Sequence, residues 1–156
     1  MDASLAIPFS AVTSLELYDH QSILPLDMER LFRAASDALP LVLLYAGPHP
    51  SVLDDLEEIE VSFIDDATIS GVHAEFMDDP SPTDVITFDH GEILISTETA
   101  IRQAVLGAHS PMRECALYVI HGLLHLNGHD DHSQEEFASM KEIQESILSQ
   151  VWPEPA

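Results

Sequence analysis

The chain contains very few basic residues. Its 156 residues include only five that are Lys or Arg, against 28 that are Asp or Glu, so the formal net charge is −23. Such a charge repels nucleic-acid phosphates at long range and offers them few cationic contacts. The composition fits a solvated acidic surface, but a basic partner or a local basic patch hidden by the average would give the same totals.

The features of secreted and membrane proteins are also missing. The single cysteine, Cys115, lies in an apolar run and cannot form an internal disulfide, which fits a reducing compartment. The longest apolar stretch, at 39–46, is interrupted by Pro40 and is far too short to span a bilayer. Residues 1–4 lack the basic segment of a secretory signal. We therefore expect a cytoplasmic protein with no membrane association.

No internal repeat, low-complexity tract or Gly/Ser-rich linker divides the chain. Apolar residues make up 46% and charged residues 21%, which is typical of a soluble globular protein, and the length suits one ordinary domain. The sequence therefore predicts a single domain over residues 1–156.

Hydrophobic spacing predicts both strands and helices. Alternating apolar residues predict strands at 58–64, 84–88 and 92–96, with a hairpin turn at 89–91 between the last two. Helical spacing, together with capping residues, predicts helices at 27–38, 65–76, 98–106, 112–127 and from 133 onward. The first helix is expected to end before Pro40, and 78–82 to form a loop. The last helix is expected to bury Phe137, Met140, Ile143, Ile147 and Val151. Three or four strands packed by helices make an α/β (or α+β) domain.

The predicted helix at 112–127 is apolar nearly all round and should pass through the core. Four residues with polar groups nevertheless occur on it at spacings of four, three and four, so they share one stripe: Glu114, Tyr118, His121 and His125. Each buried polar group that lacks a partner costs about 1–3 kcal/mol. The stripe therefore needs partners inside the fold.

The two histidines of this stripe indicate a metal site. Imidazoles at i and i+4 can present two nitrogens to one tetrahedral cation. A lone buried histidine is more often a satisfied core residue, but four more potential ligands follow Gly128 within residues 129–132. We therefore expect His121 and His125 to bind a metal with one further ligand from this loop.

Three ligands would leave a coordination position for water, as in catalytic zinc sites. A metal there lowers the pKa of bound water to about 7 and polarises a phosphoryl or carbonyl oxygen. The position that holds the general base in His-Glu-x-x-His proteases is Gly122 here, which disfavours a peptidase of that type. Glu114 is the candidate to orient a ligand or to act as a base, and the alternative is a simple first-turn acid.

Three segments have distinctive motifs: residues 121–131 read H-G-L-L-H-L-N-G-H-D-D, residues 82–88 read P-T-D-V-I-T-F, and residues 91–96 read G-E-I-L-I-S. They resemble the motifs H-G-x-L-H-L-x-G-Y-D-H, P-T-D-V-L-S-F and G-D-I-x-I-S of the YbeY family of bacterial ribosomal RNA maturation factors. The resemblance covers roughly residues 58–148.

This resemblance implies a zincin-like YbeY fold with a small mixed sheet and a central metal-binding helix. It implies a zinc-dependent, single-strand-specific endoribonuclease in 16S rRNA 3′-end maturation and ribosome quality control, with ribosomal RNA and the small ribosomal subunit as partners. One alternative is a non-catalytic ribosome-assembly or adaptor factor with a structural metal, whose acidic surface docks on basic ribosomal proteins. Another is a zinc hydrolase of a different substrate.

Two positions depart from the family pattern. The family's third histidine ligand aligns with Asp131, so Asp131 is the first choice for the third ligand and His132 the alternative. The family's arginine aligns with Met77, which cannot pair with phosphate as a guanidinium does. Clustering of the four arginines around one cleft would favour RNA as the substrate, and scatter would count against it.

Two further points stay open in the sequence. Two histidines and a carboxylate also suit iron, nickel or manganese, so zinc depends on the resemblance and on ligand chemistry. Thr83 and Asp84 fit a turn that satisfies local backbone amides, while the resemblance implies that they lie near the metal cleft.

Overall fold

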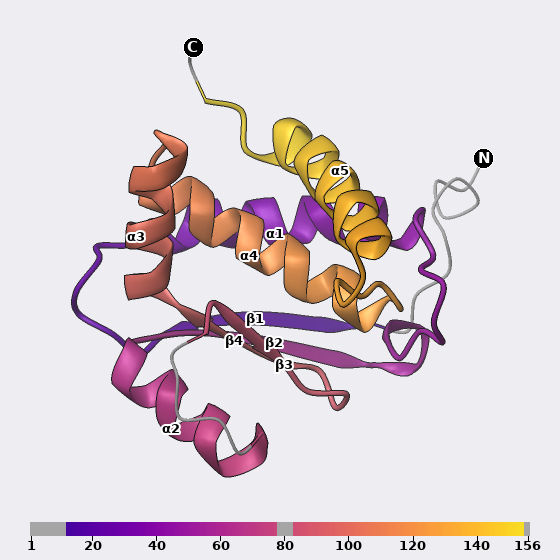
Figure 1. Cartoon of the computed structure of the whole chain (residues 1–156), viewed down its shortest axis with the longest axis horizontal. Helices are drawn as coiled ribbons and strands as arrows, with labels where there is room; N and C mark the ends of the chain where they lie inside the picture. The colour runs from indigo at the N-terminus through magenta and orange to yellow at the C-terminus, as the bar shows by residue number, and fades with distance from the viewer. Residues whose placement is uncertain (1–11, 78–82, 155–156) are drawn as a thin grey trace.

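Four strands form one mixed sheet in the order β1-β2-β4-β3 (Figure 1) in the computed structural model, which describes residues 12–77 and 83–154. β1 is parallel to β2 and β2 to β4, whereas β3 is antiparallel to β4. The register places the residue pairs Leu17–Val61, Val61–Ile93 and Ile86–Leu94 side by side. The strands span Ser14–Asp19 (β1), Glu58–Ile64 (β2), Val85–Thr87 (β3) and Glu92–Ser96 (β4).

Helices cover both faces of this sheet, but unequally. The helices span Met28–Leu43 (α1), Asp66–Met77 (α2), Thr97–Gly107 (α3), Pro111–Leu126 (α4) and Gln134–Val151 (α5), with a short 3-10 turn at Leu53–Asp55 (η2). In Figure 1, α2 lies on one side of the sheet and α1, α3, α4 and α5 lie on the other.

Side-chain alternation along the strands explains this two-sided packing. Val61, Phe63 and Ile93 belong to the main core cluster with α1, α4 and α5, whereas Ile64 and Leu94 belong to a smaller cluster with α2. Burial on both sheet faces explains the continuous apolar run at 93–95 in β4, whereas β2 keeps exposed glutamates at Glu58 and Glu60.

The central element is α4, which contacts α1, α3, α5, β3 and β4. Its first turn is capped by the Ser110 hydroxyl, which accepts from the Arg113 amide, and Pro111 is the first helical residue. Gly122 brings the helix close to the sheet, since a Cβ at this position would lie 2.8 Å from Cγ2 of Ile93. Residue 122 therefore faces the sheet, and the position has no room for a glutamate side chain.

The predicted α/β class, the predicted helices and the three named strands are confirmed, with boundary differences. One boundary is wrong at α1, which continues through Pro40 to Leu43. Proline removes one helical hydrogen bond, but Ala38 and Val42 are fully buried on either side of it, and this packing stabilises the extra turn. The predicted loop at 78–82 lies outside the described residues.

Two other expectations fail. The strand β1 was not identified, because an edge strand of six residues with only Leu15 and Leu17 as inward apolar residues gives a weak alternation signal. Phe137 is 56% exposed rather than buried, while Met140, Ile147 and the unpredicted Leu148 form the buried face of α5.

Within 12–77 and 83–154, no helix combines the length and apolar character needed to cross a membrane.

We predict that Gly122→Ala destabilises the protein by about 1–3 kcal/mol, the usual cost of overpacking a core, because the added methyl group collides with buried Ile93. Urea denaturation measures the change. Gly71→Ala on α2 is the control, since a Cβ there meets nothing within 4 Å, and it should not destabilise the protein. Equal stability of Gly122→Ala and wild type would contradict the close helix–sheet contact.

Candidate metal centre

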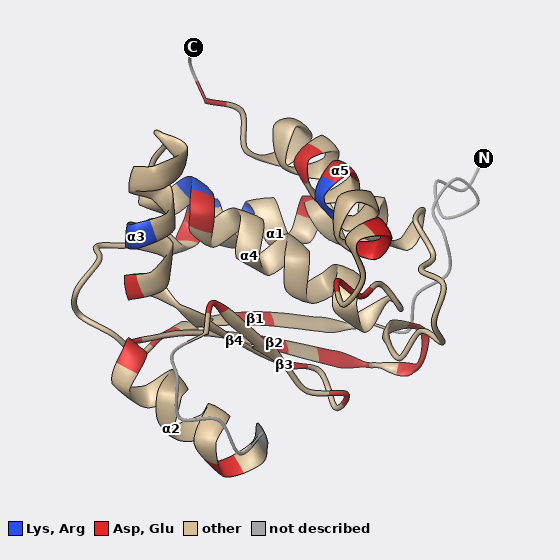
Figure 2. Ribbon diagram, in the orientation of Figure 1, with Lys and Arg blue, Asp and Glu red and all other residues tan. Residues whose placement is uncertain are grey.

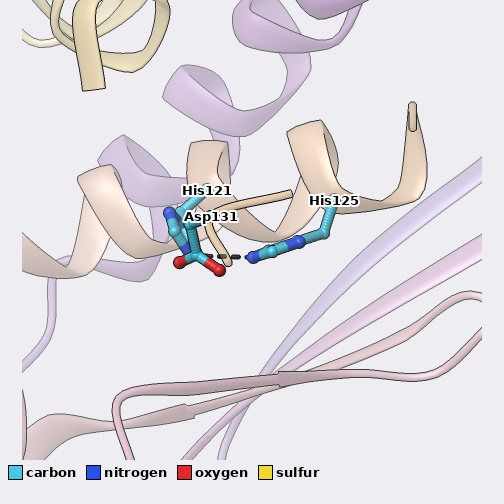
Figure 3. Close-up of side chains that lie close together, drawn as sticks. All are labelled: His121, His125 and Asp131. Carbon is cyan, nitrogen blue, oxygen red and sulfur yellow. Dashed lines mark hydrogen bonds and ion pairs between the residues drawn. The ribbon is translucent and has the colours of Figure 1, made fainter. Parts of the chain in front are cut away.

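Two histidines of α4 and one aspartate from the following loop converge on one point (Figure 3). Nε2 of His121 lies 3.0 Å from Nε2 of His125 and 3.7 Å from Oδ2 of Asp131. A tetrahedral ion with bonds of about 2.1 Å separates its ligand atoms by about 3.4 Å. The spacing of these three donors therefore suits a small divalent cation.

The opposite nitrogen of each histidine ring has a carbonyl partner. Nδ1 of His121 lies 2.9 Å from Oε1 of Gln144, and Nδ1 of His125 lies 3.1 Å from the carbonyl oxygen of His129. Both partners are acceptors, so the tautomer that satisfies them has its proton on Nδ1 and leaves a bare lone pair on each Nε2. Two lone pairs and a carboxylate facing one another repel unless a cation lies between them. The donor set therefore fits a metal.

Asp131 reaches this point because the turn after α4 is fixed to the loop that follows α1. The amide nitrogen of the Asn127 side chain donates to the carbonyl oxygens of Val42 and Tyr45, at 3.0 and 3.1 Å. Gly128 has φ +90, and a Cβ there would lie 2.2 Å from the carbonyl oxygen of His49, so only glycine fits this turn. This anchored turn directs residues 129–131 back along the helix.

His132, the alternative candidate for the third metal ligand, lies away from the two histidines of α4. The side chain of His132 is 84% exposed, and its Nε2 lies 3.2 Å from Oδ1 of Asp130. It belongs with Asp130 and Asp131 to a second group of possible donors. The structure thus brings together His121, His125 and Asp131 and leaves His132 outside that set.

A cavity of about 180 Å³ lies beside His121 and Asp131. Glu114, only 7% exposed, lies in its wall and pairs with Nε2 of His109. Glu114 is thus the first-turn acid of α4 and also lines the cavity that His121 and Asp131 line, while its role as a base or as a residue that orients a ligand stays a prediction. The full lining is Asp84, Gln103, Glu114, Leu117, Tyr118, His121, Asp131, Phe137 and Gln144.

Asp84 lies both in a local turn and beside the cavity, as the sequence and the family resemblance predict. Its Oδ1 accepts from the amide of Val85 at 2.8 Å, as in a local turn, and the residue lines the cavity. Two partners of the site, Gln144 and His109, were not identified from the sequence. Neither residue belongs to the α4 stripe or to the loop after it, so no spacing in the sequence links them to His121 or Glu114.

Burial favours the neutral form of three side chains of α4. It raises the pKa of the Cys115 thiol to about 12. Burial, followed by the negative charge of Glu114, raises the pKa of the Tyr118 hydroxyl. Burial, followed by repulsion from His121, lowers the pKa of His125. Since metal ligation requires neutral imidazole, the environment of His125 favours the ligating form.

The four arginines do not gather around this cavity, and Figure 2 shows the basic positions dispersed over α1, α3, α4 and α5. Arg33, Arg102 and Arg113 each form an ion pair, with Glu29, Asp66 and Glu145 respectively. Arg30 lies over the ring of Trp152, 3.6 Å from its centroid. By the criterion set from the sequence, this scatter counts against RNA as the substrate.

Comparison with known proteins gives one consistent family. A sequence model described as Endoribonuclease YbeY matches residues 17–152. A curated Endoribonuclease YbeY of Thermobifida fusca is 30% identical over 147 residues, covering 83% of this chain and 89% of that protein. The one of Protochlamydia amoebophila is 37% identical over 99 residues, covering 56% of this chain and 66% of that protein.

For a third relative, from Rhodopirellula baltica, the identity is 41% over 107 residues, or 62% of this chain and 55% of that protein. The chain thus matches less than two thirds of the length of this relative and of the Protochlamydia one. The solution structure of TM1509 from Thermotoga maritima shares the fold, with a TM-score of 0.61 and 21% identity over 88% of this chain and 89% of that one.

We predict that Gln144→Ala weakens binding of a divalent metal by about 10–100-fold, the usual cost of losing a residue that orients a ligating histidine. Competition with a chromogenic chelator measures the affinity. Gln150→Ala removes an exposed glutamine of the same helix, whose side chain donates to the carbonyl of Ser146, and should leave the affinity unchanged. Equal affinities for the two variants would exclude the orienting role of Gln144.

A second prediction concerns pH and the metal-free protein. The pKa of His125 in the folded chain is lower than its ordinary value of 6.5, so the unfolded chain takes up this proton first as the pH falls. His125 therefore destabilises the fold progressively below about pH 6.5. Free energies of unfolding at pH 7.5 and 5.5 should differ less in His125→Gln than in wild type. The exposed control His90→Gln should retain the wild-type difference, and the same difference in all three proteins would contradict the prediction.

Proposed function

Since this chain belongs to the endoribonuclease YbeY family, we propose that it is a metal-dependent endoribonuclease that cleaves single-stranded RNA, acting in 16S rRNA 3′-end maturation and ribosome quality control. The observation that carries the proposal is the convergence of two bare imidazole nitrogens and a carboxylate beside a cavity. Ribosomal RNA and the small ribosomal subunit are the partners that this function requires.

The metal is proposed to be zinc, held by Nε2 of His121, Nε2 of His125 and a carboxylate oxygen of Asp131. When bound, it supplies Lewis acidity towards a phosphodiester and lowers the pKa of attacking water. Gln144 and the carbonyl of His129 hold the two rings in the ligating orientation. Glu114, which lines the cavity wall and pairs with His109, is the residue proposed to orient this water or to accept its proton.

The adaptor alternative requires a closed site with four protein ligands. Such a site would include His132, but that side chain is exposed and pairs with Asp130. A set of three donors beside a cavity instead supports catalysis, because it leaves a coordination position for water.

One observation favours a second candidate function, a zinc hydrolase that acts on a substrate other than RNA. The net charge is −23, and the four arginines are dispersed and already engaged. The family's arginine position is occupied by Met77, the last residue of α2. RNA cleavage therefore has to be tested separately from metal binding.

The experiment measures metal content and RNA cleavage in protein purified without a His-tag or added metal. We expect about one zinc per chain in wild type and in His132→Ala. We expect its loss in Asp131→Ala and in His121→Ala/His125→Ala, with cleavage of a single-stranded rRNA-precursor segment falling by at least about 100-fold. His90→Ala is the control for removing an exposed histidine.

Different results of this experiment would overturn different parts of the proposal. Equal, negligible metal in wild type and in the double variant would overturn the metal centre. Metal that depends on His121 and His125, with no cleavage of RNA, would overturn the endoribonuclease and leave the adaptor or the other hydrolase. If the metal is lost in His132→Ala but not in Asp131→Ala, the third ligand is His132 and not Asp131.

A further inference from the structure

A second cavity, of about 410 Å³, adjoins the one at the metal centre. It lies between the end of α3, the first half of α4 and α5, and Figure 1 shows α3 and α5 on either side of α4. The volume lies within the range of common ligand pockets, about 300–1,000 Å³. Five residues line both cavities, so together they form one continuous groove: Gln103, Glu114, Leu117, Phe137 and Gln144.

The groove contains an aromatic side chain that is exposed although its spacing along the helix predicts burial. Phe137 lies on α5 with the spacing of a core residue, yet it is 56% exposed. Leu106, from the end of α3, lines the same groove and is 79% exposed. Apolar side chains gathered in a groove mark a binding site more often than single exposed ones do. An aromatic face in a groove is the usual platform on which an unpaired nucleobase stacks.

The groove also holds the one cation that the rest of the fold leaves unused. All five basic residues of the chain lie in the described part, and within 12–77 and 83–154 the four arginines are each bonded to, or stacked on, another residue. Lys141 is exposed, lines the groove and has no ion pair or hydrogen bond among those residues. An ammonium without a partner can bind a phosphate.

Phe137 and Lys141 lie on the same face of α5. They are four residues apart, so they are neighbours along the helix surface, with an axial separation of about 6 Å. This separation is comparable to the distance between a nucleobase and the phosphate of its own nucleotide. One helix face thus offers a stacking surface and a phosphate contact in a suitable arrangement.

We propose that this groove is a subsite for one nucleotide of single-stranded RNA, whose base stacks on Phe137 and whose phosphate binds Lys141. The inference rests on the proposed function, because the phosphodiester that is cleaved would lie in the adjoining metal cavity. It also gives a physical basis for single-strand preference, since a base paired and stacked within a duplex has no free face for Phe137. Glu114 and Glu145 also line the groove, but they pair with His109 and Arg113, so Lys141 is the cation left to bind the phosphate. Since the chain has only five basic residues, its contacts with RNA are concentrated at this one nucleotide.

The test is RNA binding by the metal-loaded full chain, measured with a fluorescently labelled hexanucleotide. Stopped-flow fluorescence anisotropy records binding before cleavage. Phe137→Ala should weaken binding about 10-fold, the scale for loss of one stacked base. Phe137→Leu keeps the apolar contact but loses the aromatic face, and it should weaken binding similarly. Phe32→Ala, which removes a 44% exposed phenylalanine of α1, should leave binding unchanged.

Lys141 is tested by salt dependence, which a merely structural role would not change. Each phosphate contact adds about −0.7 to the slope of log K against log salt concentration for a single strand. Lys141→Gln should reduce the slope by about that amount, while Phe137→Ala should leave the slope unaltered. Arg33→Gln, which removes an exposed arginine paired only with Glu29, should retain the wild-type slope.

The outcomes separate this inference from the proposed function. If wild type cleaves RNA, and Phe137→Ala and Lys141→Gln bind it as wild type does, the subsite is overturned and the endoribonuclease stands. If wild type binds RNA through Phe137 but does not cleave it, the subsite stands and the endoribonuclease is overturned. If it neither binds nor cleaves RNA, both are overturned. If Phe137→Ala turns a dimer into a monomer without changing RNA affinity, the groove holds a second copy of the chain and the subsite is overturned.

Discussion

The packing of α4 between the sheet and the other helices is the constraint on which the site depends. This helix is buried on almost every side, and Gly122 allows it to approach the sheet at Ile93. A helix held so closely cannot rotate, so the directions of His121 and His125 are fixed by apolar contacts before any metal binds. The cost of burying two imidazoles is offset by their carbonyl partners, and the remaining lone pairs are directed at each other.

The third donor depends on a different kind of constraint. Asp131 is on a loop, and loops are usually variable in position. Here the loop begins in a turn whose backbone and side chain are bonded to the segment after α1, and two glycines allow the approach: Cβ atoms at Gly47 and Gly128 would lie 2.2 Å from the opposite backbone. These contacts fix the conformation of the turn, and the turn positions the Asp131 carboxylate beside the rings of His121 and His125.

The sequence predicts those features of the fold and the site that depend on residues close together in the chain. The strand at Glu58–Ile64 and the ends of α4 follow from alternation and capping, which are local, and the pair His121 and His125 follows from spacing along one helix. Spacing restricts the third donor only to the loop after α4, and the choice of Asp131 over His132 comes from the family resemblance. The continuation of α1 through Pro40 depends on the burial of Val42 by distant residues. The contact of Gln144 with His121 joins residues 23 positions apart, and the position of Phe137 along α5 does not reveal that its side chain is exposed. No local pattern records such tertiary contacts.

The net charge of the chain restricts where an RNA substrate can bind. On the proposed function, RNA recognition is concentrated at the metal centre and its groove, because a chain of net charge −23 offers RNA phosphates few cationic contacts. The central claim is that His121, His125 and Asp131 hold one metal ion. Its most direct test is a crystal structure of the metal-loaded protein with anomalous diffraction at the zinc edge. The account predicts one peak about 2.0–2.2 Å from Nε2 of His121, Nε2 of His125 and a carboxylate oxygen of Asp131. A peak held by Asp130 and His132, or no peak at the two histidines of α4, would contradict it.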